Sequence, residues 1–130
     1  MKESELLSQI IKTLYSVVRL IRGNAGTFYS KDGSRRVNGL PKGFPDCFGV
    51  ILADKSANGL PVPVFIETKV RPNKPTPEQT KFIEEYRAGG CCAGVCYSVS
   101  DAWRLIRPYI KPELDIYPEE VLRRWDMLSQ

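Results

Sequence analysis

The stretch that decides the fold is Val62-Pro63-Val64-Phe65-Ile66-Glu67-Thr68-Lys69-Val70, an apolar, β-favouring run with two charges near its end. Alternate side chains of a strand share one face, so Glu67 and Lys69 are expected to lie on the same side. The neighbouring residues are so apolar that both faces of this strand are expected to be covered. Charged groups in a covered strand point to function, whereas an exposed same-face pair would contribute little.

A second acidic residue comes before another apolar run. Asp46 follows Gly43-Phe44-Pro45 and leads into residues 47–53. If the runs 46–53 and 62–70 pair, two carboxylates and an ammonium group meet at one end of a sheet. Such a group can hold a divalent metal and activate water. The simpler alternative for Asp46 is a hydrogen bond to a turn amide.

The N-terminal third is expected to hold a helix, a short strand and a loop. Residues 3–22 carry apolar side chains at helical spacing, and Gly23-Asn24 is expected to end the helix. A short strand is expected at 27–30. Residues 31–43 are rich in Gly, Asn and Pro and are expected to form a loop.

The rest of the chain alternates between helix and strand. Thr76-Pro77-Glu78-Gln79 predicts a helix start with a capping box, and this helix is expected to run to about Arg87, before Gly89-Gly90. A buried strand of small residues is expected at 91–97, parallel to a neighbour. A helix capped by Ser100 and ending near Pro108 follows, and a last helix from about Pro118 places Val121, Leu122, Trp125 and Leu128 on one stripe.

This order predicts a small α/β domain, with a mixed central sheet flanked by helices. The 130 residues fit one domain, with a core at about 1–109 and a C-terminal helical extension at 110–130. Apolar residues make up 42% and charged residues 26%, which is ordinary for a globular protein. The chain has no apolar run of about 20 residues and no recognisable signal peptide, so we expect a cytoplasmic protein without a membrane partner.

The chemistry available to this chain is limited by its composition. It contains no histidine, which excludes Ser-His-Asp, Cys-His and His-metal mechanisms within the chain and leaves carboxylates, lysine and the backbone. The four cysteines, Cys47, Cys91, Cys92 and Cys96, have an unusual spacing for zinc. We interpret the last three as part of a closely packed strand.

With these elements in this order, Asp46 and Glu67-Thr68-Lys69 resemble the PD-(D/E)xK (restriction-endonuclease-like) nuclease core, of element order αβββαβα. More specifically, the chain resembles the VRR-NUC (virus-type replication-repair nuclease) family in its small stand-alone form. The segments that carry the resemblance are Gly43–Asp46, Phe65–Lys69 and Thr76–Phe82, with Glu3 and Gly94-Val95-Cys96 in addition. The resemblance extends to about residue 107.

The resemblance implies a role for each matching residue. Asp46, Glu67 and the carbonyl of Thr68 would ligate Mg²⁺ or Mn²⁺, which prefer oxygen ligands. Lys69 would orient or deprotonate the attacking water, and Gln79 would lie at the edge of the site. Glu3 would reach the metal through water. Glu5 is the competing candidate for that role, and Glu3 could instead simply favour the helix dipole. The capping box alone also explains Gln79.

Basic residues lie on both sides of the motif and are expected to contact DNA phosphates without reading sequence. They are Lys31, Arg35, Arg36, Lys42, Arg71, Lys74 and Lys81. The net charge of +4 permits such a partner without requiring it.

The resemblance also bears on the substrate. Stand-alone members of this family act as homodimers on branched DNA, including four-way (Holliday) junctions, and a phage-encoded member would work in the bacterial host cytoplasm. We therefore expect a homodimeric, structure-selective endonuclease. The alternatives are a monomeric flap or single-strand nicking nuclease and a DNA-binding module without catalysis. The apolar residues of 110–130 are expected to pack on their own domain or on a twofold partner.

Overall fold

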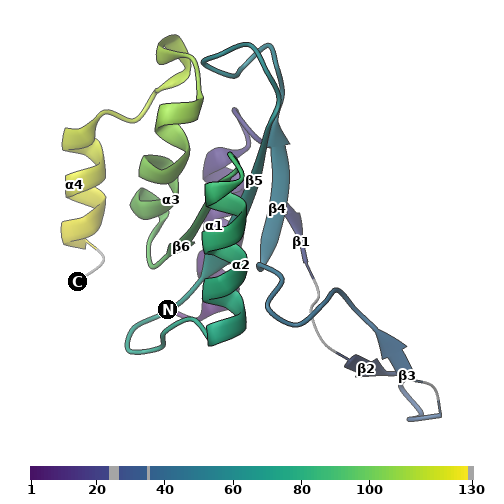
Figure 1. The fold of residues 1–130 in the computed structure, drawn as a ribbon. Helices are drawn as coiled ribbons and strands as arrows, with labels where there is room; N and C mark the ends of the chain where they lie inside the picture. Colours follow the sequence, from purple (N-terminus) through teal and green to yellow (C-terminus); the bar gives the residue numbers. More distant parts are fainter. Residues whose placement is uncertain (24–26, 35, 129–130) are drawn as a thin grey trace.

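A four-stranded mixed sheet forms the centre of the molecule (Figure 1). The computed structural model describes residues 1–23, 27–34 and 36–128, with the backbone alone at 27–29 and 36–38. The sheet order is β1-β4-β5-β6. β4 runs antiparallel to β1 and β5, and β6 runs parallel to β5, as expected for a crossover through a helix. The strands are β1 (Ile21–Arg22), β4 (Cys47–Ile51), β5 (Val62–Thr68) and β6 (Cys92–Cys96).

Helices cover the two faces of this sheet unequally. The main apolar cluster contains buried residues of α1 (Glu3–Leu14) and α3 (Val99–Ile106) together with Val64 and Ile66 of β5. On the other face, α2 (Pro77–Ala88) packs against Phe65 through Phe82 and Tyr86. The β1–β4 part of this second face is more open, since Ile21 and Val50 are 59% and 42% exposed. The α/β class and the flanking helices are therefore confirmed.

The expected helix over residues 3–22 is wrong beyond Leu14. Val17 and Val18 donate backbone hydrogen bonds to Leu14 O and fill the core from a turn, and Ile21–Arg22 pair with β4. Apolar residues in this connection continue the helical spacing by chance, although β-branched valines favour extended backbone. The first strand of the central sheet along the chain is therefore β1, which follows α1 after a short connection.

The strand expected at 27–30 exists as β2 (Thr27–Tyr29), but it lies outside the central sheet. It pairs antiparallel with β3 (Arg36–Asn38), so the expectation that 31–43 is entirely loop is wrong. The hairpin projects from the body of the molecule (Figure 1). Asp32 accepts hydrogen bonds from Ser30 and Ser34 in its turn. Gly33, at a φ of 75°, lies in the same turn, so the glycine read from the sequence belongs to a hairpin turn and not to a long loop.

The expected start of α2 is confirmed in detail, while that of α3 shifts by two residues. Thr76 Oγ accepts from Gln79 N, and the Gln79 side chain accepts from Thr76 N. For α3, the N-cap is Ser98, whose hydroxyl accepts from Asp101 N. The expected cap, Ser100, lies inside the helix and donates instead to Asp126. Both serines suit a cap, and the tertiary contact to Asp126 decides between them.

The C-terminal extension packs on its own domain. After η1 (Arg107–Tyr109) and η2 (Pro112–Leu114), α4 (Glu119–Leu128) lies beside α3 (Figure 1). Of the expected stripe, Leu122 is fully buried, whereas Leu128 is 83% exposed. Among the described residues, no helix is both long and apolar enough to cross a membrane.

Candidate functional site

Asp46 directly precedes β4, and Thr68 of β5 holds its carboxylate. Just before it, Gly43 adopts a φ of 92°, and a Cβ at this position would come within 2.9 Å of the Glu78 backbone. This close approach brings the loop against the start of α2. Asp46 Oδ2 accepts hydrogen bonds from Thr68 N at 2.8 Å and from Thr68 Oγ1 at 2.6 Å. Thr68 thus orients the carboxylate with two donors.

Glu67, Lys69 and Gln79 meet at the same end of the sheet. Lys69 Nζ lies 3.5 Å from Glu67 Oε2, and Gln79 Nε2 donates to the same oxygen at 3.1 Å. Gln79 therefore serves two purposes, since its Oε1 accepts from Thr76 N in the capping box at 2.9 Å. The backbone of Lys69 is fixed in turn, because its N–H donates to Cys96 O of β6 at 3.0 Å. The structure brings the four expected catalytic residues together.

The electrostatics of this site are dominated by Glu67. Its side chain is 2% exposed, and Glu67 Oε1 has no hydrogen-bond partner among the described residues. Burial, and next the negative charge of Asp46, raise the pKa of Glu67 to about 8, while the charge of Lys69 acts in the opposite direction. Two carboxylates and one lysine leave this buried site short of positive charge. A divalent cation held by oxygen atoms fits that shortage.

The other expected metal ligands are less well placed. The described residues contain no group of three or more acidic or cysteine side chains arranged to hold a metal. Glu3 Oε1 lies 3.5 Å from Asn73 Nδ2, in the loop that follows Lys69, and Glu5 is exposed. A role for Glu3 through water stays a prediction. Thr68 was expected to offer only its carbonyl, whereas its amide and hydroxyl hold Asp46.

The expected DNA-contacting residues fall into separate groups. Exposed Lys42, Arg71 and Lys74 lie in the segments that flank Asp46 and follow Lys69. Lys81 lies 3.9 Å from Glu85 on exposed surface of α2. Lys31 lies in the turn of the projecting hairpin. Arg35 and the side chain of Arg36 lie outside the described residues.

The sequence reasoning missed the aromatic packing beneath the loop that carries Asp46. Phe44 makes edge-to-face contacts with Phe48, Phe65 and Phe82, at centroid distances of 5.4, 6.1 and 5.3 Å. These rings join β4, β5 and α2 next to the site, so they hold the loop and the helix at a fixed distance. The only sequence signal for this packing is an aromatic residue in each of those segments.

Compared with models of protein families, with curated proteins and with solved structures, the chain gives no match.

Proposed function

We propose that this protein is a metal-dependent endonuclease that hydrolyses phosphodiester bonds in DNA and has a PD-(D/E)xK core. One observation carries the proposal: Glu67 is buried with an unsatisfied oxygen, beside Asp46, Lys69 and Gln79. A purely structural carboxylate at this depth would be expected to satisfy both oxygens. Perturbed, buried acids beside a lysine are typical of catalytic sites.

Each residue of the site has a distinct task in this proposal. Asp46 and Glu67 would hold Mg²⁺ or Mn²⁺, and such an ion supplies charge stabilisation at phosphorus and a more acidic water. Thr68 keeps Asp46 in position, and Gln79 fixes one oxygen of Glu67. Lys69, whose side chain is 13% exposed, can hold the attacking water or take its proton while balancing the charge of the phosphate.

The substrate that we propose is branched DNA, cut by a homodimer in the manner of a Holliday-junction resolvase. The exposed cations on both sides of the site support a phosphate contact that does not depend on sequence. A monomeric flap or single-strand nicking nuclease is the second candidate, because the extension that could have covered a twofold surface packs on α3 instead. Sedimentation at working concentration separates the two, and a strict monomer argues against paired cuts.

The direct test is cleavage of a panel containing a four-way junction, a flap, a splayed arm, linear duplex and single strand, with Mg²⁺ or Mn²⁺. Glu67→Ala and Lys69→Ala should lose cleavage and keep DNA binding. A binding module without catalysis predicts instead that both variants behave like the unmodified protein. If no substrate is cut with either ion, the nuclease proposal is wrong.

A further inference from the structure

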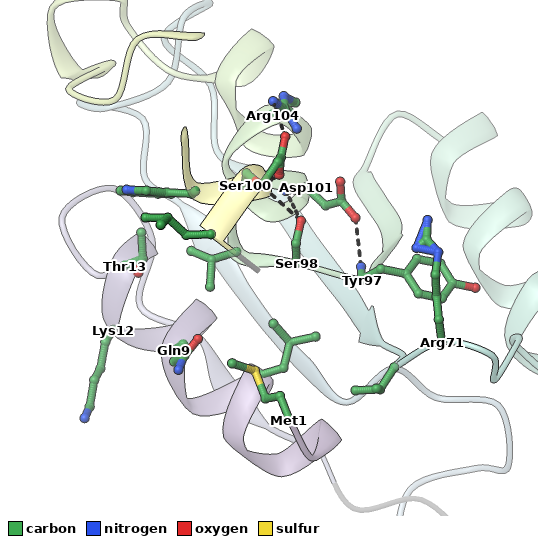
Figure 2. Close-up of a pocket in the computed structure, with 16 residues that line it drawn as sticks. Met1, Gln9, Lys12, Thr13, Arg71, Tyr97, Ser98, Ser100, Asp101 and Arg104 are labelled. Atoms are coloured by element: carbon green, nitrogen blue, oxygen red, sulfur yellow. Dashed lines mark hydrogen bonds and ion pairs between the residues drawn. The ribbon is translucent and has the colours of Figure 1, made fainter. Parts of the chain in front are cut away.

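A pocket of about 1070 Å³ lies between α1, the start of α3 and the end of α4 (Figure 2). Neither carboxylate of the candidate nuclease site lines it. Its volume is at the upper end of the range for small-molecule sites, so it has room for an extended ligand. Lys12 and Leu128, which line it, are exposed, so the pocket opens to solvent.

The pocket adjoins the nuclease site through two chain segments. Val70 and Arg71 line the pocket and directly follow Lys69, and Tyr97 and Ser98 directly follow Cys96. The hydrogen bond from Lys69 N to Cys96 O joins these segments as they leave β5 and β6. A DNA strand that runs from Lys69 toward the pocket would therefore reach Arg71 next.

Aromatic and cationic residues line the rim of this pocket. The guanidinium carbon of Arg71 lies 4.5 Å from the centroid of the Tyr97 ring. Lys12 lies on α1 at the opposite rim, and its side chain points outward to solvent (Figure 2). Trp125 and Val99 add apolar surface to the wall. Bases can stack on such surfaces while the cations contact phosphates, which is how proteins hold single strands without reading sequence.

The two carboxylates in the wall are already engaged within the protein. Asp101 Oδ2 accepts from Tyr97 N at 2.9 Å. Asp126 pairs with Arg104 at 2.9 Å and accepts from Ser100. Lys12 and Arg71 form no ion pair with any residue in the described part of the chain, and neither does Asp101. The charges of the wall without an ionic partner are therefore two cations and one carboxylate, an excess of one positive charge.

We propose that this pocket binds a single-stranded arm of the DNA substrate as that arm leaves the nuclease site. The inference rests on the proposed nuclease function and favours its second candidate, because a flap has an unpaired strand and a four-way junction has only paired arms. A paired duplex keeps its bases stacked inside, so the apolar wall would gain no contact from it. An unpaired strand offers both the bases and the phosphates that the pocket can contact.

Binding is measured with the full chain in chelator, using a labelled oligothymidylate of about ten nucleotides and a duplex of equal length. Lys12→Glu should weaken single-strand binding roughly tenfold, because it reverses a charge at the rim. Tyr97→Ala should weaken it about fivefold or more through lost stacking. Lys55→Glu, the matched control, lies in the β4–β5 turn at the opposite end of the sheet and should leave binding unchanged. Binding to the duplex should be the same in all these proteins.

Tryptophan fluorescence locates the bound strand. Trp103 is fully buried, so protection from acrylamide quenching on adding the oligonucleotide reports on Trp125, the other of the two tryptophans. Unchanged single-strand binding by both pocket variants, or an equal loss in Lys55→Glu, would overturn the inference. Because no metal is present, the result does not depend on cleavage. A protein that cuts nothing but binds the strand through Lys12 would contradict the nuclease proposal alone.

Discussion

Among single residues, Glu67 has the protonation state that matters most for stability. Its pKa of about 8 exceeds the ordinary value of 4.5, first because of burial and then because of the charge of Asp46. The folded protein therefore keeps a proton that the unfolded chain releases between these two pH values. This contribution to stability is full below about pH 4.5 and is lost as the pH rises through about 8.

Replacing Glu67 with Gln should therefore separate stability from activity. In chelator, the free energy of unfolding of the unmodified protein should fall by on the order of a few kcal/mol more between about pH 5 and pH 9 than that of Glu67→Gln. The variant should also lose cleavage. Urea unfolding at the two pH values measures the first effect. Parallel pH profiles of the two proteins would contradict the raised pKa.

Gln79 both caps α2 and donates to Glu67, and two substitutions can test these roles separately. Gln79→Glu keeps an acceptor for Thr76 N but loses the donor to Glu67, so it should reduce cleavage at least about tenfold with little loss of helix stability. Thr76→Ala, the matched control, should cost about 1 kcal/mol of unfolding free energy and affect cleavage much less. Equal effects of both variants on cleavage would show that Gln79 acts only as a cap.

At this scale, the sequence predicted which residues meet but not every contact between them. Strand alternation was enough to put Glu67 and Lys69 on one face, and the capping box placed Gln79 at the start of α2 near them. The two hydrogen bonds from Thr68 to Asp46 depend on how the chain closes around the end of β5. Periodicity carries no information about that closure.

Among the elements, α4 shows how an amphipathic extension is fixed by charge as well as by burial. Arg104 Nη2 lies 2.8 Å from Glu119 and 2.9 Å from Asp126. The hydrogen bond from Arg104, followed by that from Arg107, lowers the pKa of Glu119. The stabilising contribution of Glu119 is therefore present above its ordinary pKa and is lost as the pH falls.

Arg104→Gln should loosen α4 without affecting the rest of the fold. We expect a loss of about 1 kcal/mol in unfolding free energy and faster amide exchange in α4 than in α2. The matched control is Arg123→Gln, because Arg123 is 73% exposed and its pairing with Glu119 is long, at 4.0 Å. It should change stability by less than about 0.5 kcal/mol. Equal exchange in the two variants would show that apolar packing alone holds α4.

The element boundaries show where sequence patterns are insufficient. Spacing predicted α2 almost to the residue, because Thr76, Pro77 and Gln79 form a local signal. α1 ends at Leu14, and Ile21 further along pairs with Phe48, a contact between distant residues. Such contacts override local propensity, which is why β1 and β3 were not predicted.

For the whole molecule, the proposed DNA contacts imply a dependence on salt. Lys74→Ala should weaken binding of all DNA sequences alike and reduce the slope of log affinity against log salt by about 1. Lys55→Ala, at the far end of the sheet, should leave the slope unchanged. Titrations at several salt concentrations measure both. A sequence-dependent loss would contradict a role for Lys74 in phosphate contact.

The two hydrogen bonds from Thr68 to Asp46 also have a consequence for biosynthesis. Asp46, Glu67 and Gln79 emerge from the ribosome one after another, and β6 follows them with the carbonyl that fixes Lys69. A growing chain that ends before β6 lacks part of this support. The proposed nuclease activity is therefore expected only once most of the domain has been synthesised and folded.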